Sequence, residues 1–223
     1  MEKNFLTIDW DYFIDVHNAK SNSYRETQED ILSKWYREYL VALEEDQHLE
    51  TGYTLGAIYD EFLEEVLPNL RFDTEEELIL SESHAAAYQE AINSHADYVY
   101  LWDAHSDLGY GGLEALNYEV NCANWLGKLL KERKIKKAYI IYSPYTKEEN
   151  WEFHEIIKAY PICFMSLKEF LLKNPYFNKI HICRSGPWTP PWYDYTFYEL
   201  AKSFHLKVKD YVGGERDWHP KNL

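Results

Sequence analysis

The stretch from Tyr98 to Asp107, YVYLWDAHSD, constrains the fold of this chain more than any other. It begins as an apolar, aromatic run that favours a β-strand, and it ends in three potential metal ligands at alternate positions, Asp103, His105 and Asp107. Side chains two residues apart in an extended backbone point to the same side, so we expect the three to converge where the strand leaves its sheet. Open α/β sheets bind ligands at that edge, and a divalent cation would relieve the repulsion between crowded titratable groups. The pattern favours a metal site over a solvated loop in which an aspartate caps a helix.

A second acidic pair, Asp9 and Asp11, ends the predicted first strand, which covers residues 5–13 as FLTIDWDYF. Aspartate is disfavoured inside strands, so the pair indicates a site at the strand end. One interpretation is a metal centre. The other is the nucleophile and acid of haloacid-dehalogenase-like phosphatases, which begin with a similar DxD, and Ser143 after a later strand partly fits it. Phe13 stands where those phosphatases usually have Thr or Val, so a phosphatase using Asp9 is the weaker alternative.

Strands and helices alternate along nearly the whole chain. Apolar residues at helical spacing predict helices over 27–45 (with Thr27 as its cap), 54–67, 85–94, 121–133, 148–159, 167–172 and 193–204. Short apolar runs predict strands over 5–13, 78–80, 98–102, 138–142, 162–165, 179–184 and 206–211. This alternation is typical of a three-layer α/β fold, in which helices cover both faces of a mostly parallel sheet. Because the chain shows neither a repeat nor a linker, residues 1–223 are predicted to form a single domain.

Composition argues against two classes of partner. The chain has 38 acidic and 23 basic residues, a net charge of −15, and nucleic acid needs lysine and arginine for its phosphates. No apolar run approaches the length of a membrane span, so no membrane partner is expected. Three cysteines without a CxxC spacing, and an N-terminal segment without a signal-peptide core, predict a soluble cytoplasmic protein. The 20 Tyr, 8 Trp and 10 Phe provide aromatic surface suited to peptides or cationic groups, while the oligomeric state stays open.

His84, after the short LILS run, adds a third element to the DxD and DAHSD motifs. The three elements together resemble the arginase/agmatinase-type ureohydrolases of the arginase–deacetylase superfamily, which carry a His before a helix, D-A-H-x-D after the next strand and D-x-D after another. An N-terminal D-x-D-Y-F with a later D-x-H-x-D is most like the small peptide arginases, which convert arginine within a ribosomally made peptide to ornithine. The familiar arginases have DxD after DAHxD. The shifted order here requires the first strand to lie beside Asp103.

The resemblance implies a binuclear manganese hydrolase that cleaves a guanidinium C–N bond of peptidyl arginine, leaving ornithine and urea. The implied ligands of the two Mn²⁺ ions are Asp9, Asp11, His84, Asp103, His105 and Asp107, with Asp9 and Asp103 bridging. Asp9, Asp103 and Asp107 are the implied catalytic residues, because two metal ions lower the pKa of a shared water. Two alternatives are an agmatinase-like or deacetylase-like enzyme acting on a small molecule, and a binding module without activity.

Four further residues are candidates for contacting an arginine-containing peptide. Trp188 and Trp192 lie in RSGPWTPPWY after a predicted strand, where prolines would hold them as cation–π walls for a guanidinium group, or simply as a packed loop. Asn124, in EVNCANWL, would orient a substrate amide, and Asn121 is the expected cap of the helix that follows. Glu215, in GGERDWH, is a candidate for the acid that holds the substrate.

Overall fold

A computed structural model describes residues 2–17 and 28–220, and a seven-stranded parallel sheet forms its centre. The order across the sheet is β11 (Lys207–Asp210), β5 (Glu77–Ser81), β10 (Lys179–Cys183), β1 (Asn4–Asp9), β6 (Tyr98–Asp103), β7 (Lys137–Tyr142) and β8 (Ile162–Phe164). β1 and β6 lie in the middle, where sheet and helices bury them on both faces. Their nearly continuous apolar sequences reflect that position.

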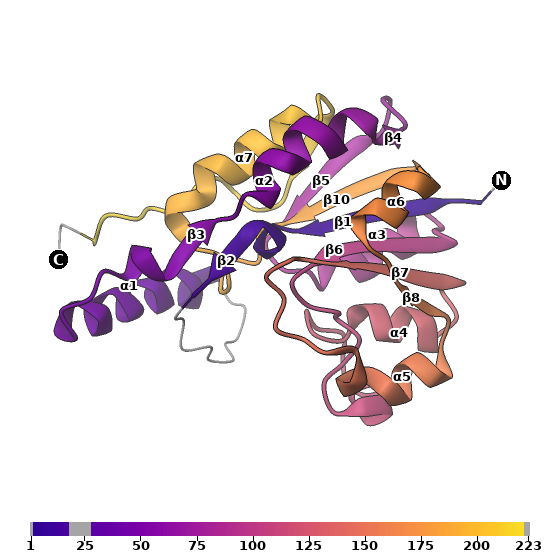
Figure 1. The fold of residues 1–223 in the computed structure, drawn as a ribbon, viewed down its shortest axis with the longest axis horizontal. Helices are drawn as coiled ribbons and strands as arrows, with labels where there is room; N and C mark the ends of the chain where they lie inside the picture. The colour runs from indigo at the N-terminus through magenta and orange to yellow at the C-terminus, as the bar shows by residue number, and fades with distance from the viewer. Residues whose placement is uncertain (1, 18–27, 221–223) are drawn as a thin grey trace.

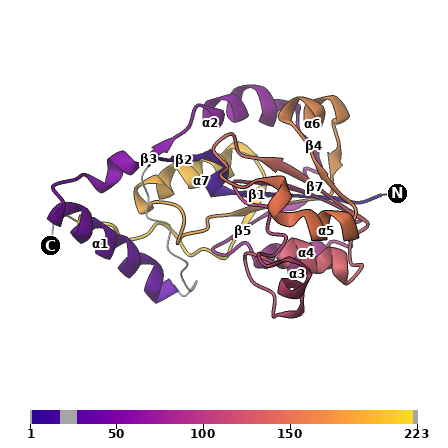
Figure 2. The same cartoon turned by 60° about the horizontal axis from the view of Figure 1, so that its bottom comes forward.

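Helices cover both faces of this sheet, as the two ribbon views show (Figure 1, Figure 2). One layer holds α3 (Ala86–Asn93), α4 (Trp125–Lys131) and α5 (His154–Ala159). The opposite layer holds α2 (Ile58–Glu61) with its π-helical continuation Phe62–Val66, α6 (Leu167–Lys173) and α7 (Asp194–Ser203). The long helix α1 (Gln28–Glu44) extends from one end of the molecule and contributes Trp35 to the second layer's core. The predicted three-layer α/β fold is confirmed.

Alternating side chains of the central strands contribute to two separate hydrophobic cores, one on each face of the sheet. In β6, Tyr100 and Trp102 pack with Phe170 of α6, whereas Val99 and Leu101 pack with Trp125 of α4. The alternation follows from the twofold side-chain period of a strand. Because residues 99–103 are all buried, the two cores together hold the end of β6 firmly in place.

Several predicted elements differ from the structure where polar side chains compete for the backbone. The first strand ends at Asp9 and a 3-10 helix follows at Trp10–Phe13, because the Asp9 carboxylate accepts a hydrogen bond from the Asp11 amide. The helix predicted over 121–133 begins only at Trp125, since the preceding asparagines bond to the local backbone instead. The Asn121 carboxamide thus accepts from Ala123 and does not cap α4.

Shorter elements complete the chain. The helix predicted over 54–67 is partly strand, since β3 (Tyr53–Leu55) pairs antiparallel with β2 (Ile14–Val16) before α2 begins. A second small sheet joins β4 (Arg71–Phe72) to β9 (Tyr176–Phe177). Further 3-10 turns lie at Leu49–Gly52, Leu67–Asn69, Gly112–Asn117, Asn150–Phe153 and Pro191–Tyr193. The expected cap at Thr27 lies outside the described residues.

Candidate metal centre

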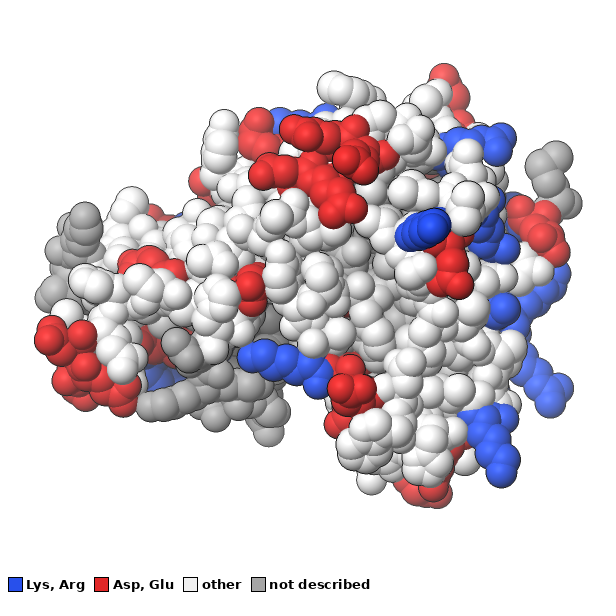
Figure 3. All heavy atoms as spheres, viewed as in Figure 1, with Lys and Arg blue, Asp and Glu red and all other residues white. Residues whose placement is uncertain are grey.

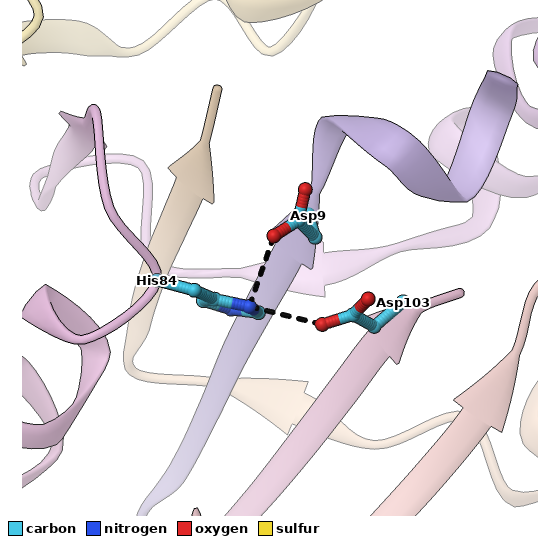
Figure 4. Close-up of side chains that lie close together, drawn as sticks. All are labelled: Asp9, His84 and Asp103. Carbon is cyan, nitrogen blue, oxygen red and sulfur yellow. Dashed lines mark ion pairs between the residues drawn. The ribbon is translucent and has the colours of Figure 1, made fainter. Parts of the chain in front are cut away.

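The carboxyl ends of β1 and β6 bring the DxD and DAHSD motifs together. The two strands pair in parallel with Ile8 opposite Trp102, so Asp9 and Asp103 follow as neighbours at the same edge. His84 reaches them from the loop after β5, on the far side of β10. Figure 4 shows Asp9, His84 and Asp103 pointing toward one another. The first strand therefore lies beside Asp103, as the shifted motif order requires.

All six predicted metal ligands line one cavity of about 230 Å³ at this edge. The complete lining is Asp9, Asp11, His84, Asp103, His105, Asp107, Tyr110, Cys122, Ala123, Ser185 and Trp188. Among the described residues, two groups have metal-binding geometry, Asp9 with His84 and Asp103, and Asp11 with Asp103 and His105. The groups share Asp103, which places it between two ligand sets.

Interatomic distances show how closely the two groups approach each other. His84 Nδ1 lies 3.0 Å from Oδ2 of Asp103 and 3.2 Å from Oδ2 of Asp9. His105 Nδ1 lies 2.9 Å from Oδ2 of Asp11 and 3.4 Å from Oδ1 of Asp103. Asp103 thus presents one carboxylate oxygen to each histidine, which is the arrangement of a bridging ligand. The His105 side chain is 40% exposed and that of His84 only 1%, so the His105 group faces the opening of the cavity.

Turns, not extended backbone, make the ligands of each motif converge. The strand ends at Asp103, whose Oδ1 accepts from the His105 amide at 2.8 Å. Asp107 lies in the left-handed region with φ 52°, an uncommon conformation that turns its carboxylate back to within 3.0 Å of His84 Nδ1. Trp125 Nε1 holds that carboxylate by donating to Oδ2 at 2.6 Å. The expectation that an extended backbone aligns these side chains is wrong for residues beyond Asp103.

A buried hydrogen-bond chain fixes the proton on the other nitrogen of His84. Starting at its far end, the Ser81 hydroxyl donates to the Ser83 carbonyl (2.9 Å), so Ser81 accepts from Nε2 of His181 (2.8 Å). His181 is neutral, because burial and the charge of His84 lower its pKa well below the usual range. Its Nδ1 therefore accepts from the Thr7 hydroxyl (2.8 Å), and Thr7 accepts from Nε2 of His84 (2.8 Å).

With a proton fixed on Nε2, the other ring nitrogen of His84, Nδ1, faces carboxylates and can take up either a second proton or a metal ion. Three carboxylate oxygens surround it at 3.0–3.2 Å, from Asp9, Asp103 and Asp107. Acceptors facing one another at 1–6% exposure are costly unless a cation lies between them. A proton or a metal ion would supply that positive charge. The donor set of carboxylates and imidazole fits a hard divalent ion such as Mn²⁺.

The pKa values of the metal-free site also indicate that its crowded carboxylates require a positive charge. Burial, with the charge of Asp11, raises the pKa of Asp9 to about 6. Burial and the charges of Asp11, Asp107 and Asp9 raise the pKa of Asp103 well above its usual range. Burial opposes charge on His84, but the three carboxylates outweigh it and raise the pKa of His84 well above its usual range. The site therefore holds protons that a metal ion would replace.

The four predicted substrate contacts lie in different places. Trp188 lines the cavity, with its ring centroid 6.2 Å from that of His105. Trp192 instead packs among aromatic rings, 5.6 Å from Trp35 and 5.9 Å from Trp218. Asn124 is buried, and its carboxamide bonds to the backbone at Ala115, Glu119 and Asn121. Glu215 is exposed, and like Trp192 and Asn124 it does not line the cavity.

Some site residues carry no motif that would reveal them in the sequence. Tyr110, Cys122, Ala123 and Ser185 line the cavity, and the Ser185 hydroxyl donates to Asp9. For the hydrogen-bond chain behind His84, the sequence does contain a signal: the polar residues Thr7 and His181 interrupt apolar strands. Buried polar groups need partners, and the hydrogen bonds of Thr7 and His181 lead to His84. Ser143, the candidate second motif of a phosphatase, donates to the Tyr12 carbonyl and does not line the cavity.

An ion-pair network holds the loop that carries Ser185 and Trp188. Arg184 is 3% exposed and pairs with Glu82 and with Asp194, the latter at 3.0 Å. Asp194 also pairs with Arg216, and the Gly186 amide donates to Glu82 at 2.9 Å. The loop is thereby tied to α7 and to the segment preceding His84.

No protein-family model, curated protein or solved structure matches the chain. Within the described residues, every helix is too short or too polar to cross a membrane.

Proposed function

We propose that this protein is a binuclear manganese hydrolase that cleaves a guanidinium C–N bond, converting an arginine side chain within a peptide to ornithine and urea. The supporting observation is Asp103, which presents one oxygen to each of two groups that another aspartate and a histidine complete. Four aspartates in the lining would balance the charge of two divalent ions with both histidines neutral. Two such ions, when bound, lower the pKa of a water and supply hydroxide at neutral pH.

Individual residues then take distinct roles. Asp9, Asp11, His84, Asp103, His105 and Asp107 would hold the ions. Asp107, oriented by Trp125, would accept a hydrogen bond from the attacking water, which makes it a general base in this proposal. Trp188 would hold the guanidinium by cation–π contact beside His105.

The cavity lining favours a cationic substrate. Among the described residues it contains no lysine or arginine, the side chains that usually bind phosphate, so it offers little to a phosphatase substrate. Hydrolysis of a free guanidino compound or of an acetylated amine remains as the alternative reaction at the same ligand set. Measuring conversion of a peptide and of free guanidino compounds under the same conditions distinguishes these reactions.

The deciding experiment is mass spectrometry of an arginine-containing peptide incubated with the protein and Mn²⁺. We expect a loss of about 42 Da per converted arginine, the difference between arginine and ornithine. Asp103→Asn should abolish the conversion, while Asp60→Asn, which changes an exposed aspartate by the same atoms, should leave it intact. Metal analysis should give two Mn²⁺ per chain. Conversion of agmatine or free arginine but of no peptide would refute the peptide assignment, and a metal-free, inactive protein would refute the hydrolase.

A further inference from the structure

Two segments beside the cavity form an acidic surface that carries no lysine or arginine. Residues 109–124 and 148–157 contain neither of these, and they carry the acids Glu114, Glu119, Glu148, Glu149, Glu152 and Glu155. Three lysines flank the segments: Lys128 donates to the Tyr118 carbonyl, Lys147 donates to the Val16 carbonyl, and Lys158 follows the second segment in α5. With six glutamates against these three lysines, the surface has a net negative charge.

Side-chain contacts join the two segments into one surface at the mouth of the cavity. Tyr110 lines the cavity, donates to Glu148 and packs its ring 5.6 Å from that of Phe153. A Cβ on Gly112 would lie 2.5 Å from the Glu155 carboxylate, so the 3-10 turn at Gly112–Asn117 touches α5 directly. Cys122 from the first segment also lines the cavity. Figure 2 shows α5 on the side of the molecule that comes forward in that view.

Large apolar side chains project from this acidic surface. Trp151 is 71% exposed, Tyr110 51% and Leu113 39%. Exposed apolar residues gathered beside a cavity mark an interaction surface more often than a packing defect. Aromatic rings among carboxylates suit a partner with both cationic and apolar side chains, through cation–π contact and charge pairing.

Several lysines lie at the amino ends of the sheet strands, opposite the acidic surface. β7, β10 and β11 begin with lysine, and Lys3 precedes β1. Acidic residues lie at the same end, where Glu76 pairs with Lys179 and Glu77 with Lys207. Figure 3 shows blue side chains, with red ones among them, toward the end of the molecule where the N-terminus lies. The metal ligands and the acidic surface lie at the carboxyl ends. These lysines therefore lie at the opposite ends of the strands from the surface that would meet a cationic partner.

We propose that this surface, defined by Tyr110, Leu113, Glu114, Trp151 and Glu155, binds the basic segment of a polypeptide that flanks the residue processed in the cavity. This inference rests on the proposed function. A cavity of about 230 Å³ is smaller than the pockets that enclose whole drug-sized ligands, so it admits the end of one side chain. The rest of a polypeptide substrate must lie outside, and Tyr110 connects the cavity to this surface.

Fluorescence anisotropy of labelled peptides tests the proposal. One peptide carries lysine and tyrosine around a central glutamine, which replaces arginine so that binding does not depend on turnover, and its partner carries glutamate in place of lysine. Glu114→Lys with Glu155→Lys should weaken binding of the basic peptide by about tenfold, because exposed charge pairs contribute modestly each. Trp151→Ala should also weaken it. The matched control is Glu64→Lys with Glu65→Lys, an equal charge change on exposed residues of the opposite layer, and it should keep most of the binding.

The outcomes separate this proposal from the enzymatic one. Equal affinity for both peptides, or equal weakening by the surface variant and its control, would overturn the docking surface. Sedimentation showing a dimer that Trp151→Ala dissociates would also overturn it, since a second copy would then cover the surface. Selective binding of the basic peptide without conversion of its arginine form would support the surface and count against the hydrolase alone.

Discussion

Replacing Thr7 by valine tests whether the buried hydrogen-bond chain prepares His84 for a metal ion. Valine has nearly the shape of threonine, so packing in β1 is preserved while the hydroxyl is lost. His84 Nε2 then loses its acceptor and His181 Nδ1 loses its donor, both at 0–1% exposure. In the neutral form of His84, the remaining proton is then expected to lie on Nδ1, where three carboxylates accept it, and no longer on Nε2. That proton would compete with the metal ion for the same position.

The magnitude follows from the two lost bonds. Each buried polar group left without a partner costs about 1–3 kcal/mol, so we expect the metal-free variant to lose about 2–6 kcal/mol of its free energy of unfolding. Loss of a hydrogen bond behind a metal-binding histidine typically weakens metal affinity about 10–100-fold. Isothermal titration of Mn²⁺ into the metal-free protein measures the affinity, and thermal unfolding measures the stability.

Thr7→Ser is the matched control, because serine keeps the hydroxyl and loses only a methyl group. It should retain most of the Mn²⁺ affinity of the unmodified protein. If Thr7→Val folds and binds Mn²⁺ as tightly as Thr7→Ser, the hydroxyl does not set the proton position on His84 and the reasoning fails.

Three further predictions follow from the geometry of the site. Trp125→Phe removes the donor to Asp107 with little change in shape, and Mn²⁺ titration should show about 10–100-fold weaker binding. Because the pKa of Asp9 is about 6 without metal, Asp9 is protonated below that pH and Mn²⁺ affinity should fall as the pH drops from about 7.5 to about 5.5; a constant affinity over this range would contradict the site. Arg184→Leu leaves the buried Asp194 and the half-buried Glu82 without that partner, and urea unfolding should show a loss of about 3–5 kcal/mol, whereas an unchanged midpoint would show that the network is not stabilising.

The sequence predicts the layers of this fold well because its central strands are apolar throughout and separated by helices. Residue type, position after strands and the family resemblance pick out six candidate ligands, and the structure brings all six side chains into one cavity. The backbone conformation that brings these side chains together was not predictable from the sequence. Extended geometry accounts for residues only up to Asp103, whereas the left-handed turn at Asp107 and the bond from Trp125 depend on tertiary contacts. Local patterns carry no information on such contacts.

The substrate contacts were harder to predict for a related reason. Trp188 and Trp192 are four residues apart in the same proline-rich loop, yet one lines the cavity and the other packs against Trp35 of α1. Nothing in the loop itself distinguishes them, because α1 lies far away in the sequence. Conversely, Thr7 and His181 stand out in the sequence as polar interruptions of apolar strands, and buried polar groups of this kind indicate a hydrogen-bond network.

The reversed order of the two acidic motifs matters little to the site, and the sheet explains why. Parallel strands all deliver their carboxyl ends to one edge, so the neighbours of a strand in space decide which side chains meet, whatever their order along the chain. β1 lies between β10 and β6, with β5 one strand further, and this single placement puts Asp9 close to both His84 and Asp103. A strand order that moved β1 to the edge of the sheet would separate Asp9 from both. The central position of the N-terminal strand is therefore the feature of the fold on which both groups of candidate metal ligands depend.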